Sequence, residues 1–106
     1  MSGSDRQGDS AADWQRLDHW LWCARFLKTR AAAARFAADG RVRINRQPTV
    51  KPHARVRPGD ILTFVVGGRV RVVEVIGLGE RRGPAREASA LYRELGEDGQ
   101  GSVNPT

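Results

Sequence analysis

The sequence predicts a small α+β domain in which two packed short helices lie against a small, curved, mostly antiparallel sheet, followed by a C-terminal helix. Three observations support this class. The chain has 106 residues, which suits one domain. Apolar residues recur at helical spacing up to about residue 38, and the pattern then changes to short alternating segments separated by turn signals.

The first helix is predicted from about Arg16 to Leu27. Asp18 falls in the first turn, where a carboxylate favours the helix N-terminus or pairs with a nearby arginine, so we assign it a structural role. The apolar positions form one stripe, which consists of Leu17, Trp20, Leu21, Ala24 and Leu27.

Two aromatic residues of this helix, Trp22 and Phe26, lie outside the apolar stripe, beside Arg25. One interpretation is that they offer a stacking surface for an unpaired base. The other, which we favour, is that they pack against the sheet or the C-terminal helix. Cys23 lies on the apolar stripe and reads as a small core residue.

The second helix is predicted from Arg30 to Ala38. Thr29 is a suitable N-cap, and the alanine-rich body strongly favours a helix that stops at Asp39 and Gly40. The small alanines permit close helix packing, while Arg30 and Arg35 project from the opposite face.

The remaining elements are strands and one helix. Residues 41–45 and 61–66 read as strands, with a strong turn at 57–60 between them. Gly67 and Gly68 predict a tight hairpin into a strand over 69–75. Residues 85–95 regain helical spacing and predict the C-terminal helix, whose shared face contains Ala88, Leu91, Tyr92 and Leu95.

Charge divides the chain into three parts. Residues 1–13 and 96–106 each carry a net charge of −2, and we expect both to be disordered acidic tails. The domain between them, residues 14–95, carries 17 Lys and Arg against 7 Asp and Glu, a net charge of +10. All of these cations except Lys28 and Lys51 are arginines, whose planar fork suits bidentate contacts to phosphate. A polyanion is therefore the expected partner.

Other classes of protein are disfavoured by what the sequence lacks. No apolar run approaches the roughly 20 residues that span a bilayer, and the start has no basic-then-apolar signal segment, so we expect a cytoplasmic protein. Cys23 is the only cysteine, which rules out an internal disulfide. Together with His19 and His53 it makes no metal-ligand pattern, and we expect no metal and no cofactor.

Several short motifs occur in a specific order. They are "RLDHWL", "KTR", "ADGRVRIN", "VKP" and "RPGD", within residues 16–66. Each is weak alone, but the ordered set resembles the alpha-L RNA-binding motif first described in small-subunit ribosomal protein four. The stretches "LDHWLWCARFLKTR" and "RRGPAREASALYREL" further resemble the heat shock protein fifteen family of small ribosome-associated proteins.

The resemblance implies a non-enzymatic protein that binds ribosomal RNA on the large subunit, particularly free large subunits that hold a nascent chain on transfer RNA. This would be a stress-response role in ribosome recycling or quality control. The chain departs from the family at two places. Arg46 stands where glycine is common, which predicts a strained or differently shaped turn, and the C-terminus is acidic and neutral rather than basic.

Charge clustering and the resemblance together predict the RNA-binding residues, with no catalytic residue among them. These are Arg16, Arg25, Lys28, Thr29, Arg30, Arg35, Arg41, Arg43, Asn45 and Lys51. One alternative is a DNA-binding regulator of the helix-turn-helix type. The other is an enzyme, because this domain type is also appended to pseudouridine synthases and tyrosyl-transfer-RNA synthetases. We expect the protein to be a monomer.

Overall fold

The computed structural model describes residues 13–96, so nearly all of both predicted tails lies outside the described residues. The elements in chain order are β2 (Gln15–Arg16), α2 (Leu17–Cys23), α3 (Arg30–Ala38), β3 (Val42–Ile44), β4 (Gln47–Thr49), β5 (Arg55–Val56), β6 (Ile61–Val66), β7 (Arg69–Val75), α4 (Ala85–Ser89) and β8 (Tyr92–Gly96).

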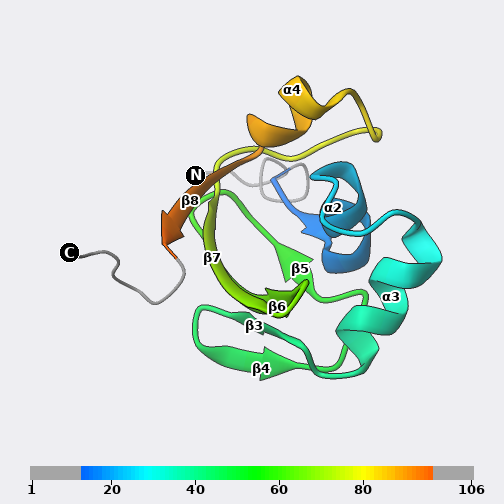
Figure 1. The fold of residues 1–106 in the computed structure, drawn as a ribbon, viewed down its shortest axis with the longest axis vertical. Coiled ribbons are helices and arrows are strands. Elements are labelled where there is room, and N and C mark those ends of the chain that lie inside the picture. Colours follow the sequence, from blue (N-terminus) through cyan, green and yellow to red (C-terminus); the bar gives the residue numbers. More distant parts are fainter. Residues whose placement is uncertain (1–12, 97–106) are drawn as a thin grey trace, which may run out of the picture.

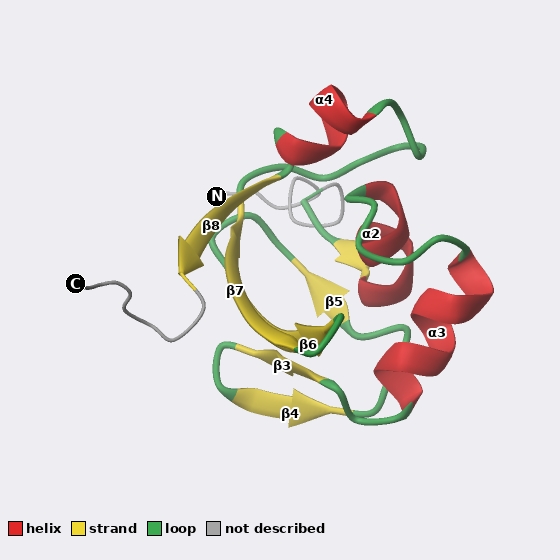
Figure 2. Ribbon diagram, in the orientation of Figure 1, coloured by secondary structure: helices red, strands yellow, loops and turns green. Residues whose placement is uncertain are grey.

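A five-stranded sheet has the order β4-β3-β6-β7-β8, and every neighbouring pair is antiparallel. A separate two-stranded pair joins β2 to β5. Helices α2 and α3 lie together on one side of the sheet, and α4 lies beside the start of β8 (Figure 1). Colouring by secondary structure shows the same division between helices and strands (Figure 2). The predicted α+β class is confirmed.

The core lies between α2, α3 and the sheet. Strand β6 alternates in the expected way, since Leu62 and Phe64 are buried whereas Val65 between them and the turn is exposed. Trp20 is the largest buried side chain, and its indole N–H donates to the carbonyl of Gly77 at 2.9 Å. The buried indole thus satisfies its one polar group while it joins α2 to the chain after β7.

Helix α3 has the predicted bounds. The Thr29 hydroxyl accepts a hydrogen bond from the Ala32 N–H at 2.9 Å, which confirms the predicted N-cap. Ala33 and Ala37 are fully buried and face α2 through side chains small enough for close approach. Arg30 and Arg35 are exposed on the other face, as predicted.

Helix α2 ends at Cys23, four residues before the predicted Leu27. Arg25 adopts a φ of 68°, and the Arg25 and Phe26 N–H groups donate back to the carbonyls of Trp22 and Leu21. These two bonds form a Schellman motif with arginine at the left-handed position where glycine is usual. The reversal carries the Phe26 ring under the sheet, 4.9 Å from the ring of Phe64 and 4.7 Å from that of Tyr92. The packing interpretation therefore holds for Phe26.

The predicted helix over 85–95 is wrong in its second half. Helix α4 ends at Ser89, and the chain then forms β8 along the edge of β7. Two cross-strand ion pairs hold the strand, because Arg93 pairs with Glu74 and Glu94 pairs with Arg71, both at 2.5 Å. Pairing with a strand about twenty residues earlier overrides the local helical spacing.

The turn between β3 and β4 consists of Asn45 and Arg46, with φ values of 51° and 75°. Two positive φ angles in a two-residue hairpin define a turn of type I′, for which Asn-Gly is the preferred sequence. Asn45 tolerates this conformation, whereas a side chain such as that of Arg46 is strained in it. The strain predicted at Arg46 is confirmed.

Replacing Arg46 by glycine should therefore stabilise the domain. We expect Arg46→Gly to raise the free energy of unfolding by about 1 kcal/mol, the cost of a left-handed residue that carries a Cβ. The measurement is urea unfolding with an unchanged slope. Arg57 is exposed and has no positive φ, so Arg57→Gly is the matched control and should lower stability by about 0.5 to 1 kcal/mol. Equal losses from both substitutions would show that the turn is not strained.

Candidate nucleic-acid interface

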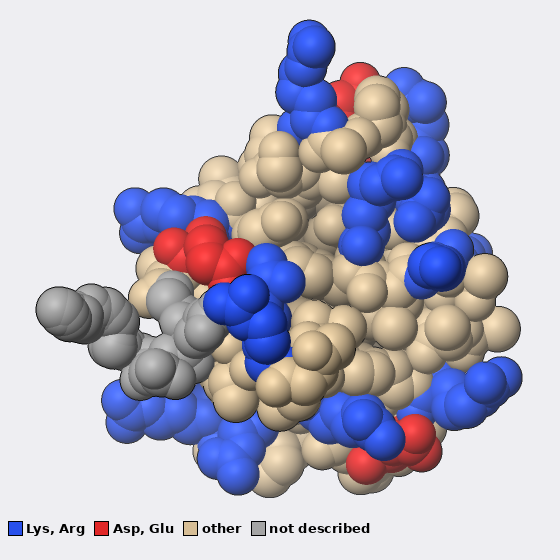
Figure 3. All heavy atoms as spheres, in the orientation of Figure 1, with Lys and Arg blue, Asp and Glu red and all other residues tan. Residues whose placement is uncertain are grey.

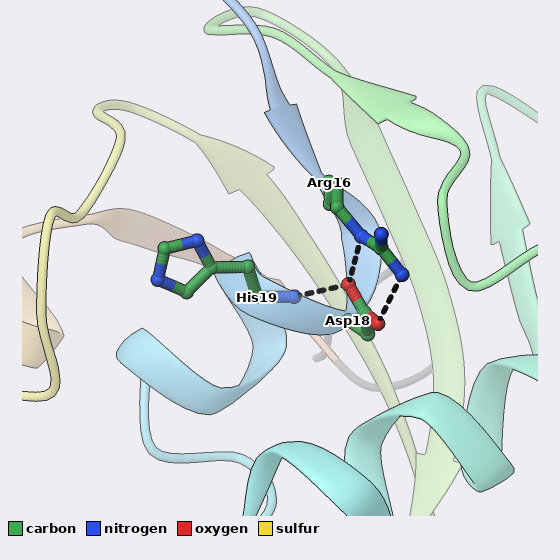
Figure 4. Close-up of polar contacts among 3 residues, drawn as sticks. All are labelled: Arg16, Asp18 and His19. Atoms are coloured by element: carbon green, nitrogen blue, oxygen red, sulfur yellow. Dashed lines mark hydrogen bonds and ion pairs between the residues drawn. The ribbon is translucent and has the colours of Figure 1, made fainter.

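Asp18 and Arg16 form an ion pair where β2 meets α2. The Arg16 Nε and Nη2 atoms donate to the two carboxylate oxygens at 3.0 and 2.9 Å, and the His19 N–H donates to Oδ1 at 2.7 Å (Figure 4). The Asp18 side chain is 6% exposed, whereas that of Arg16 is 50% exposed. The carboxylate hydrogen bonds raise the pKa of Arg16. The predicted structural role of Asp18 is confirmed, and it fixes one arginine at the surface.

Four predicted residues lie at the junction of α2 and α3 or further along α3, where Arg35 falls in the last turn. Lys28, Thr29, Arg30 and Arg35 are all exposed. Together with Arg16 we name these residues the helix-junction group. The N-terminus of α3 lies among them, and the first amides of a helix favour an anion.

The outer face of α2 carries two stacked aromatic rings. The rings of His19 and Trp22 have centroids 5.8 Å apart and planes inclined at 29°, and the Arg30 guanidinium lies 5.9 Å from the Trp22 ring. Burial and then Arg30 lower the pKa of His19 below its usual value. Trp22 also packs partly against the core. No role was predicted for His19 from the sequence. Its spacing of three residues from Trp22 nevertheless places the two side chains on one face of the helix.

The sheet-side residues do not all join the helix junction. Val42 is buried and Ile44 packs against the core, so the alternation of β3 places Arg43 on the sheet face away from the helices. Arg41 lies near the α3 C-terminus, 3.8 Å from Asp39 and 5.9 Å from the Phe36 ring. Lys51 is exposed beyond β4. These three cations therefore lie on different parts of the chain, with Arg43 on β3, Arg41 after α3 and Lys51 after β4.

Two predicted residues have their side chains engaged within the fold. The Asn45 side chain donates to Asp60 Oδ1 at 2.9 Å and accepts from the Ile61 N–H at 2.8 Å. Arg25 donates from Nη1 to the carbonyl of Gly83 at 3.0 Å. Both residues are exposed, and an RNA contact by either stays a prediction.

Acidic side chains pair with only some of the basic residues. Figure 3 shows Lys and Arg in several groups across one face, with fewer acidic groups that each adjoin basic side chains. Within residues 13–96, carboxylate ion pairs involve Arg16, Arg41, Arg71, Arg81 and Arg93, and none involves Lys28, Arg30 or Arg35. These three cations are therefore available to an external anion.

Three further features of the described residues bear on reactive, metal and membrane sites. Cys23 is fully buried, and burial raises the pKa of its thiol, which disfavours the reactive thiolate. Residues 13–96 contain no group of three or more His, Cys, Asp or Glu that could hold a metal ion. Over the same residues, no helix is both long enough and apolar enough to cross a membrane.

Comparisons with known proteins show which domain and which relatives this chain resembles. The S4 domain model matches residues 15–62. Heat shock protein 15 of Escherichia coli K12 is 45% identical over 82 residues, which cover 77% of this chain and 61% of that protein. The chain thus spans about 61% of the length of this curated relative.

Two further relatives are covered more fully. A Bacillus subtilis protein named RQC P-site tRNA stabilizing factor is 35% identical over 83 residues, which cover 78% of this chain and 94% of that protein. A solved structure of heat shock protein 15 from Vibrio cholerae, described as trimeric, superposes with a TM-score of 0.72 at 38% identity. That match covers 77% of this chain and 82% of the other.

Proposed function

Because the chain belongs to the heat shock protein 15 family and carries an S4 domain, we propose that it is a non-enzymatic protein that binds ribosomal RNA. The observation that carries the proposal is the helix-junction group. It places Lys28 and Arg30 at the N-terminus of α3, Arg35 further along the exposed face of the same helix and Arg16 at the start of α2. Within residues 13–96, Lys28, Arg30 and Arg35 have no carboxylate partner. Such a surface suits phosphates held at fixed spacing by a folded RNA.

The proposed contacts fall into two sets. Lys28, Arg30 and Arg35 bind phosphates directly, and Arg16 does so with the N–H groups that Asp18 leaves unused. Arg41, Arg43 and Lys51 form a second set, on and beside β3 and β4. Thr29 and Asn45 act chiefly by holding α3 and the β3–β4 turn in place, since both side chains accept backbone N–H groups. Arg25, at the chain reversal after α2, makes a further contact with the RNA.

We place the protein on the large ribosomal subunit, including subunits that hold a nascent chain on transfer RNA. The Bacillus subtilis relative supports this site, because its name describes a factor that stabilises transfer RNA in the P site. The role would lie in cytoplasmic ribosome recycling or quality control under stress. A monomer stays our prediction, against the trimer described for the Vibrio cholerae relative.

The direct test is sedimentation of tagged protein from a lysate of cells that express it. We expect the protein to travel with free large subunits, and to do so more strongly when translation is stalled with the nascent chain still attached. An Arg30→Ala, Arg35→Ala double variant should move toward the top of the gradient, because it loses two phosphate contacts. Tagged protein that never enters the ribosomal fractions would contradict the proposal.

The DNA-binding alternative is tested in a salt-matched binding assay. Ribosomal RNA should bind more tightly than duplex DNA of the same phosphate concentration, because the basic groups come from α2, α3 and the sheet and not from one groove-filling helix alone. Equal or tighter binding of duplex DNA would favour the regulator.

Two variants at the helix junction distinguish a residue that contacts RNA from one that stabilises the fold. Arg30 is exposed and contacts the protein mainly through the Trp22 ring, so Arg30→Ala should change the melting temperature little. It should weaken RNA binding by about 1 to 3 kcal/mol, the usual range for a charge-assisted contact. The measurements are thermal unfolding and RNA titration of the same preparation.

Thr29→Ala is the matched comparison one residue earlier. Loss of the hydrogen bond to the Ala32 N–H should lower stability by about 1 kcal/mol, and RNA binding should weaken less than in Arg30→Ala. Should Arg30→Ala unfold the domain while the folded fraction binds RNA normally, Arg30 would be structural and the binding surface would lie elsewhere.

A further inference from the structure

A hollow of about 500 Å³ lies between the β2–α2 segment and the loop that follows β7. Trp14, Arg16 and His19 line one side, and residues 78–80 line the other. We name it the Trp14 hollow. Its volume falls within the range of small-molecule sites, roughly 300 to 1,000 Å³, and it adjoins the helix-junction group through Arg16.

The walls of the Trp14 hollow are held by the fold. The buried Gln15 side chain both donates to the Gly79 carbonyl and accepts from the Gly79 N–H, which ties the loop to β2. A Cβ atom at Gly79 would lie 2.8 Å from the Cys23 Cβ, so only glycine lets the loop approach α2 this closely. The Gln15 hydrogen bonds and the close approach at Gly79 therefore fix the backbone walls of the hollow.

Two partly exposed aromatic rings line the hollow, and each is fixed by a neighbour. The Arg55 guanidinium lies 4.6 Å from the centroid of the Trp14 ring, across the β2–β5 pair. His19 is held by its stacking with Trp22, and its ring points away from the Asp18 carboxylate (Figure 4). Rings of this kind stack with any nucleobase, because every base has a π face.

The charges around the hollow favour an anionic ligand. Arg16 lies at its wall, the Arg55 guanidinium lies over the Trp14 ring, and burial and then Arg30 lower the pKa of the His19 imidazole. A lowered pKa favours the neutral imidazole, which presents an aromatic surface. Glu80 on the opposite wall offers an acceptor for the exocyclic amino group of a base.

We propose that the Trp14 hollow takes one unpaired nucleobase of the bound RNA, stacked against the rings of Trp14 and His19, while Arg16 holds an adjacent phosphate. The inference rests on the proposed RNA-binding function and adds to it a site that recognises a base in place of the backbone. Phosphate contacts alone would not separate unpaired from paired RNA, whereas this site requires an unstacked base.

The test compares two probes with the same number of phosphates, a mixed-sequence single-stranded RNA and an abasic oligonucleotide with the same sugar-phosphate chain. The unaltered protein should bind the RNA roughly five-fold or more tightly than the abasic chain, given the usual strength of one base–aromatic stack. Trp14→Ala and His19→Ala should each reduce this preference and leave the affinity for the abasic chain nearly unchanged. Trp14→Phe keeps a ring and should keep the preference.

His53 provides the matched control, because it is exposed and does not line the hollow. His53→Ala should bind both probes as the unaltered protein does. Equal affinity of the unaltered protein for the two probes, or a preference that survives both alanine variants, would overturn the inference while RNA binding stands. If the unaltered protein binds ribosomal RNA but neither probe, the inference alone is overturned. If it binds neither the probes nor ribosomal RNA, the proposed function fails and the inference fails with it.

Discussion

The buried carboxylate of Asp18 is the constraint on which this surface depends. A charge that is almost fully removed from water must be paired and hydrogen-bonded, and Arg16 and the His19 N–H meet that requirement. The same turn is anchored to the segment before β5, because the Leu17 and Asp18 N–H groups donate to the carbonyls of Ala54 and Pro52. One acidic residue thereby fixes where α2 begins and where a basic side chain meets solvent.

Local signals were sufficient for part of the fold. Thr29 caps α3, alanines form its body, and the Gly67-Gly68 pair joins β6 to β7, so each of these elements is specified by residues within it. The end of α2 and the strand β8 depend on contacts distant in sequence. Arg25 adopts a left-handed conformation that no glycine in the sequence indicates. Tyr92 pairs with Val75 in the sheet, although the apolar residues around Tyr92 have helical spacing.

The candidate site also combines residues predicted by local sequence with residues that depend on contacts distant in sequence. The exposure of Arg30 and Arg35 follows from the period of α3 and was predictable. The side-chain bonds of Asn45 were not, because Asp60 and Ile61 lie about fifteen residues further along the chain. The Trp14 hollow lies between residues 14–19 and residues 78–80, and no pattern within either segment indicates that the two segments lie side by side.

The basic residues of the described domain are proposed to bind RNA through several phosphates at once, and the salt dependence of binding measures this directly. Each neutralised phosphate contributes about 0.7 to 0.9 to the slope of log affinity against log salt. Four or more contacts predict a slope of magnitude about 3 or greater for ribosomal RNA. A slope near zero with affinity retained would contradict the account, because it would show that contacts other than ion pairs hold the RNA.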